Sequence, residues 1–163
     1  MKMNENITFE DQVLSWWVGL NRDNASRSKM RRESTMMGIQ MNESFFDLYR
    51  MVPWVKDIDA LSCVAMVISN IDGDDVDSIA TRMGKKTPSS EHSVSELRFR
   101  RIIESEGEDA ARHVVRVLPM INRYANIKET AKAIMYWDNP NQISKKNWIK
   151  DYYLANGKRN EEE

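Results

Sequence analysis

Apolar residues recur at spacings of three and four along almost the whole chain, and this is the period of one face of an α-helix. The first such segment carries Phe9, Val13, Trp16, Trp17 and Leu20. No stretch alternates apolar and polar residues for long enough to predict a strand. The sequence therefore predicts an all-α protein built as a helical bundle.

Turn-forming residues divide this pattern into a series of expected helices. Gly38, Gly84 and Gly157 stand where helices are expected to end, since glycine favours the position just after a helix. Pro53 and Pro119 interrupt two others, because proline has no amide hydrogen to continue the ladder. The expected helices cover residues 9–20, 24–37, 42–52, 57–71, 77–83, 95–103, 108–118, 126–137 and 142–156. The segment 57–71 is the most apolar and is expected to lie in the core.

Cap residues support two of these helix starts. Asn126 is followed three residues later by Glu129, which is the pattern of a capping box. Ser95 or Ser93 can cap the helix that runs to residue 103.

Residues 85–94 (KKTPSSEHSV) interrupt the helical pattern with a proline, three serines and mixed charge. We expect a loop there, joining two small helical lobes, residues 1–84 and 95–163, that together form one unit. The chain has 163 residues, and this length fits one domain or two small lobes.

The sequence shows no recognisable catalytic or metal-binding motif. Cys63 is the one cysteine, and His92 and His113 are the two histidines, which argues against a zinc site or a histidine-based active site. No phosphate-binding loop, H-E-x-x-H or G-x-S-x-G motif is present. His113 follows Arg112 on an expected helix and is interpreted as an ordinary helix residue. We therefore predict a protein that is not an enzyme and needs no metal or cofactor.

The expected compartment is the cytoplasm, with no membrane partner. No segment approaches the roughly 20 apolar residues of a membrane span. Residues 1–11 are polar and lack the apolar core of a secretion signal. A single free cysteine fits a reducing environment.

Basic residues are clustered although the formal net charge is only −1. Residues 22–32 hold five cations and one carboxylate, and so do residues 145–159. Arg98, Arg100 and Arg101 form a third cluster, and Arg112 and Arg116 lie one helical turn apart. One interpretation is a phosphate-binding surface, because a guanidinium can grip a phosphate with two hydrogen bonds. The other is a set of solvated faces that keep the protein soluble, and periodicity does not separate the two.

A run of carboxylates, Asp72, Asp74, Asp75 and Asp77, follows the most apolar segment. A calcium loop of the EF-hand type is rejected, because Asp75 and Thr81 stand where that loop needs glycine and glutamate. The run is interpreted as a solvated acidic turn, which would repel nucleic acid.

The tryptophans are interpreted mainly as core residues. Trp16, Trp17, Trp137 and Trp148 fall beside apolar positions on expected helices. Trp54 follows Pro53 and is interpreted as a buried corner between helices, with stacking on a base or a partner as the alternative.

Several motifs keep a distinctive order and spacing from about residue 13 to residue 153. They are Trp16-Trp17 with Leu20, Met30-Arg31-Arg32, Phe46-Asp47-Leu48-Tyr49 with Pro53-Trp54, the segment 95–103 (SELRFRRII), the segment 136–141 (YWDNPN), and Lys145-Lys146-Asn147-Trp148 running into Asp151-Tyr152-Tyr153. Together these motifs resemble the CasB family, the small subunit of the type I-E CRISPR surveillance complex called Cascade.

The resemblance implies an all-α, non-catalytic subunit with two helical lobes. Its implied partners are the other Cascade subunits, a second copy of itself, the CRISPR RNA and the target DNA. The implied role is to support the guide RNA and target strand and to stabilise the displaced strand of the R-loop, while base pairing reads the sequence. The candidate phosphate contacts are Arg31, Arg32, Arg98, Arg100, Arg101, Arg116, Lys145 and Lys146.

Two alternatives to this hypothesis stay open. The first is a stand-alone helical nucleic-acid-binding regulator, which predicts a helix-turn-helix with a short glycine-containing turn. No convincing turn of this kind is present. The second is a helical adaptor whose arginine clusters bind acidic proteins, and co-purification with a multi-subunit ribonucleoprotein would separate it from the Cascade hypothesis.

Overall fold

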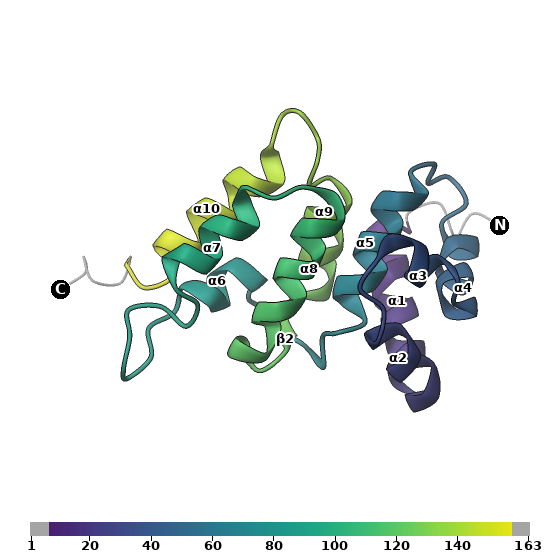
Figure 1. Ribbon diagram of the computed structural model, residues 1–163, viewed down its shortest axis with the longest axis horizontal. Helices are drawn as coiled ribbons and strands as arrows, with labels where there is room; N and C mark the ends of the chain where they lie inside the picture. The colour runs from purple at the N-terminus through teal and green to yellow at the C-terminus, as the bar shows by residue number, and fades with distance from the viewer. Residues whose placement is uncertain (1–6, 158–163) are drawn as a thin grey trace.

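The protein is predominantly helical in the computed structural model, which describes residues 7–157. The helices are α1 (Phe9–Asn21), α2 (Asn24–Arg31), α3 (Met36–Gln40), α4 (Glu43–Met51), α5 (Ile58–Ile68), α6 (Ile79–Gly84), α7 (Glu96–Ile103), α8 (Gly107–Val117), the 3-10 helix η1 (Leu118–Ile121), α9 (Ile127–Met135) and α10 (Ile143–Leu154). Two short strands, β1 (Gly73–Asp74) and β2 (Tyr124–Ala125), complete the described part. The predicted all-α class is confirmed (Figure 1).

The predicted caps form, with one change. The Ser95 hydroxyl accepts a hydrogen bond from the Arg98 amide and begins α7. The Asn126 side chain accepts from the Glu129 amide, 2.8 Å away, and begins α9. The capping box is only half formed, because the Glu129 carboxylate accepts instead from the Trp148 indole at 3.0 Å.

The prediction of a single helix over residues 24–37 is wrong, because this segment forms two helices, α2 and α3. The Thr35 hydroxyl accepts from the Gly38 amide at 2.9 Å and starts a new helix there. A side chain that bonds to the backbone in this way competes with continuation of the preceding helix. Gly38 therefore lies inside α3 instead of ending α2.

Helix α5 forms the centre of the core, as predicted. Its residues 61–68 are all buried. It packs against α3 and α4 on one side and against α8 and α9 on the other. In Figure 1 it stands between the helices α1–α4 and the group formed by α6–α10.

Helix α6 lies with the C-terminal helices, although the sequence placed it in the first lobe. It packs closely against α10, and a Cβ atom added at Gly84 would lie 2.2 Å from the Tyr152 carbonyl oxygen. The Tyr152 hydroxyl donates to the Val94 carbonyl at 2.6 Å and anchors the end of the loop 85–94. This loop therefore connects two helices of the same group, and a division into lobes at residues 85–94 stays a prediction.

The strands β1 and β2 pair in parallel, with Gly73 opposite Tyr124 and Asp74 opposite Ala125. Asn122 and Arg123, just before β2, both have positive φ angles, 62° and 58°. This pairing has no recognisable sequence pattern, because each strand has only two residues. It joins the end of α5 to the start of α9.

Four tryptophans are buried as predicted, and the fifth is not. Trp16, Trp17, Trp137 and Trp148 are at most 8% exposed, whereas Trp54 is 53% exposed. The interpretation of Trp54 as a buried corner is therefore wrong. Trp54 lies in a turn after α4, where its indole is exposed.

Candidate nucleic-acid interface

Arg31, one of the candidate phosphate contacts, is occupied inside the protein. Its guanidinium donates to the Ser69 carbonyl and to Asp72 Oδ1, both at 2.7 Å. Ser69 follows the last residue of α5, so Arg31 reaches the C-terminal end of that helix from α2. Carbonyls at a helix C-terminus are unpaired and carry partial negative charge, which a guanidinium stabilises.

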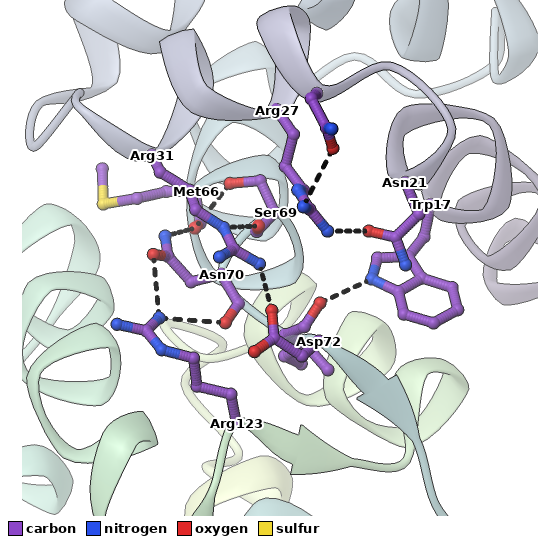
Figure 2. A network of polar contacts seen from close by, with 11 residues as sticks. Trp17, Asn21, Arg27, Arg31, Met66, Ser69, Asn70, Asp72 and Arg123 are labelled. Carbon is purple, nitrogen blue, oxygen red and sulfur yellow. Dashed lines mark hydrogen bonds and ion pairs between the residues drawn. The ribbon is translucent and has the colours of Figure 1, made fainter.

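Other donors from distant parts of the chain meet Arg31 at this junction, as Figure 2 shows. Arg123 donates to the Asn70 carbonyl at 3.2 Å, and the Trp17 indole donates to the Ile71 carbonyl at 2.9 Å. The Asn70 side chain turns back to the Met66 carbonyl at 2.8 Å. These hydrogen bonds connect α1, α2 and the segment before β2 to the end of α5, and Arg31 contributes two of them.

Each carboxylate of the acidic run has a partner. Asp72 pairs with Arg31, Asp75 with Arg82 at 2.7 Å, and Asp77 with Lys85 at 2.8 Å. Asp74 accepts from the Ile127 amide at the start of α9. The interpretation as a merely solvated turn is therefore wrong: these side chains neutralise cations and cap a helix.

Lys145 is also held within the protein. Its side chain is 6% exposed, and its ammonium lies 2.6 Å from Glu106 Oε2 and 5.7 Å from the centre of the Trp137 ring. The Lys145 ammonium holds the pKa of Glu106 below its ordinary value. Lys145 thus links α10 to the start of α8, whereas its neighbour Lys146 is exposed.

Three of the candidate arginines are brought together between α7 and α8. Arg98 and Arg101 lie one turn apart on α7, and Arg116 lies near the end of α8, which packs against α7. With His113 and Val117 they line a pocket of about 260 Å³. We call this the α7–α8 pocket.

The arginines of the α7–α8 pocket lack carboxylate partners within residues 7–157. Arg98 has a weak contact to the Met120 sulfur at 3.4 Å, and Arg116 lies 3.5 Å from His113 Nδ1. Arg101 forms no ion pair in this part of the chain. By contrast Arg112, one turn before Arg116, is engaged with two carboxylates, Glu108 and Asp109.

His113 also lines the pocket, although its sequence context did not predict a site residue. Burial lowers its pKa from the ordinary 6.5, and Arg116 adds to the effect, which favours the neutral form of the ring. A signal was present in the sequence, because His113 lies three residues before Arg116 and so shares its helix face. The sequence did not show that α7 would bring two more arginines to that face.

The remaining candidates are exposed but separate from the pocket. Arg32 follows the last residue of α2, Arg100 lies on α7, and Lys146 lies on α10. None of these three has an ion-pair partner among the residues that the structure describes.

A larger cavity, of about 500 Å³, has the opposite charge. Asp57, Asp59 and Asp138 line it together with Cys63. Burial raises the pKa of the Cys63 thiol to about 12, so this cysteine is an inert core residue and not a nucleophile. Phosphates would be repelled from this cavity.

Neither a metal centre nor a membrane span is found in the described part of the chain. Residues 7–157 contain no group of three or more His, Cys, Asp or Glu side chains placed to hold a metal ion. Their helices are too short or too polar to cross a bilayer.

The fold and the pocket define a class: a helical protein with three clustered arginines that have no carboxylate partner within residues 7–157. Within this class, the chain belongs to the CRISPR-associated protein Cse2 family, whose model matches residues 26–153. Cse2 is the small subunit, CasB, of the type I-E complex, so the resemblance seen in the sequence is confirmed.

Comparison of folds agrees with this membership. The structure is similar to a chain in the crystal structure of E. coli Cascade bound to a PAM-containing dsDNA target, with a TM-score of 0.69 and 16% sequence identity. The match covers 90% of this chain and 97% of the other. No curated protein matches the chain in sequence.

Proposed function

We propose that this small subunit grips the nucleic-acid backbone within a type I-E CRISPR surveillance complex and performs no catalytic step. Its partners in this proposal are the other Cascade subunits, a second copy of the chain, the CRISPR RNA and the target DNA. The similarity to a chain of E. coli Cascade bound to dsDNA supports it. Pairing with the guide reads the sequence, so the protein needs only to hold backbones, including the displaced strand of the R-loop.

The α7–α8 pocket is the observation that carries the proposal. Arg98, Arg101 and Arg116 line one pocket and have no carboxylate partner in residues 7–157. Grouping three unpaired guanidiniums costs electrostatic repulsion, which an entering phosphate relieves. Contacts of this kind are independent of base identity and suit a flexible single strand.

The proposal sorts the candidate residues by their partners. It assigns phosphate contacts to the three pocket arginines and to the exposed Arg32, Arg100 and Lys146. It assigns Arg31 and Lys145 a structural role, because each is held by a carboxylate inside the protein.

The test uses the triple variant R98A/R101A/R116A, assembled with the other Cascade subunits. Affinity for a single-stranded oligonucleotide is measured against salt concentration. Removing three phosphate contacts should reduce the slope of log K against log salt by about 2, since each contact contributes about 0.7 on single strands. An unchanged slope would sink the assignment.

Two controls separate the roles. The variant R50A/K56A/K86A removes the same charge from exposed positions outside the pocket and should leave the slope almost unchanged. Arg31→Ala should lower stability by about 1–3 kcal/mol, because it breaks hydrogen bonds of a charged group, and should not alter the slope. If the pocket variant instead fails to assemble, while the free variant chain binds the oligonucleotide with the same salt dependence as the free wild type, these arginines bind acidic groups of a neighbouring protein.

A further inference from the structure

His113 lies beside the pocket arginines, and one of its ring nitrogens contacts a guanidinium. Its Nδ1 lies 3.5 Å from Arg116 Nη1, at the same pocket that Arg98 and Arg101 line. A guanidinium has donors and no acceptor, so this contact is favourable when Nδ1 accepts. The contact therefore favours a neutral imidazole.

The charges around His113 favour this neutral form. Burial lowers its pKa most, followed by Arg116, with Arg101 of α7 and Arg112 of α8 acting in the same direction, whereas Asp109 opposes them. Two other elements pack against α8. The helix η1 (LPMI) has no ionisable side chain, and the ionisable groups of α5, Asp59 and Cys63, line the larger cavity instead.

A phosphate in the pocket would reverse this balance. Its negative charge would lie among the guanidiniums and would favour an imidazolium, since an opposite charge at short range stabilises the charged form of a histidine. Its oxygens could accept from both Arg116 and a protonated His113, which removes the clash between two donors.

We propose that the α7–α8 pocket receives one backbone phosphate and that His113 takes up a proton from the solvent as the phosphate enters. Nucleic-acid binding is then coupled to proton uptake, and His113 is a fourth phosphate ligand. This inference rests on the proposed function of the same pocket and adds a regulation to it: the affinity for nucleic acid increases as pH falls.

The direction of the pH effect follows from linkage. The phosphate raises the pKa of His113 in the complex above its value in the free protein. Between these two values the complex holds one more proton than the free protein, so affinity rises as pH falls through that range. Above and below the range, His113 contributes no pH dependence.

The experiment measures the affinity of the full chain for a fluorescein-labelled oligothymidylate from pH 5.5 to 8.5 at constant ionic strength. The wild type should bind about tenfold more tightly at the acid end, since one unit of pKa shift corresponds to a tenfold change in affinity. H113Q should change less than about twofold. Calorimetry at pH 7 in buffers of different ionisation enthalpy should show proton uptake by the wild type that H113Q lacks.

The chain offers a matched control in its other histidine. His92 stacks on Tyr152 and contacts the Gly84 carbonyl, outside the pocket, so H92Q should keep the wild-type pH dependence. Equal pH dependence and proton uptake in the wild type and H113Q would overturn the role of His113 and leave the proposed function standing. Absence of binding at every pH, on the free chain and in the assembled complex, would overturn the proposed function itself and this inference with it.

Discussion

Partners, more than residue type, distinguish the arginines of this protein. Arg31 and Arg98 both lie in basic clusters. Arg31 is paired with the carboxylate of Asp72, whereas Arg98 contacts the uncharged sulfur of Met120. The clusters could be predicted from the sequence, because they are local. The pairing of Arg31 could not, because Asp72 lies 41 positions further along the chain.

Glu129 provides a prediction at the same scale. Its Oε1 atom is buried and has no hydrogen-bond partner in the described residues, and burial raises the pKa of this carboxyl from 4.5 to about 7. The folded state therefore keeps a proton that the unfolded chain loses. Its contribution to stability is complete below pH 4.5, falls as pH rises from 4.5 to about 7, and is lost above that.

Replacing Glu129 with glutamine should remove this part of the pH dependence. Urea unfolding at pH 5 and pH 8 should show that the wild type loses of the order of 1–3 kcal/mol more than E129Q over this interval. E104Q, at an exposed position, is the control and should follow the wild type. Identical pH profiles for E129Q and the wild type would show that Glu129 is ionised in the folded protein.

At the scale of the element, local sequence patterns were sufficient to predict most helices but not the two strands. Ser95 and Asn126 cap the predicted helices because a cap needs only residues within one turn. The division between α2 and α3 was missed because Thr35 competes locally with a favourable helical pattern. The pair β1–β2 depends on contacts about 50 residues apart, which no local pattern reports.

Gly84 tests the packing of α6 on α10. An added Cβ would lie 2.2 Å from the Tyr152 carbonyl oxygen, which is backbone and cannot rotate away. Gly84→Ala should lower the free energy of unfolding by about 1–3 kcal/mol, the usual cost of overpacking.

Gly19 is the matched control for this prediction. It lies inside α1, and nothing lies within 4 Å of an added Cβ. Gly19→Ala should therefore stabilise the protein by about 0.5–1 kcal/mol, the usual gain from replacing a helix glycine. If both variants behave alike in urea unfolding, the close contact between α6 and α10 is not present in solution.

At the scale of the whole molecule, the fold class and the family could be predicted, while the arrangement of elements could not. Helical periodicity and ordered motifs are properties of the chain itself, and the Cse2 match confirms the family. The placement of α6 beside α10 and the convergence of α7 and α8 are properties of the folded chain. The pocket arises from this convergence, which explains why its arginines were predicted and His113 was not.

The central claim is that nucleic acid lies at the α7–α8 pocket in the assembled complex. Met120 is suited to test it, because its sulfur lies 3.4 Å from Arg98 and its side chain is 41% exposed. A photo-crosslinking amino acid would replace Met120, and in a control Met41, which is 77% exposed on the surface after α3. With complex carrying guide RNA and target DNA, we expect crosslinks to nucleic acid from position 120 and none from position 41. Crosslinks from position 120 to protein alone would contradict the account.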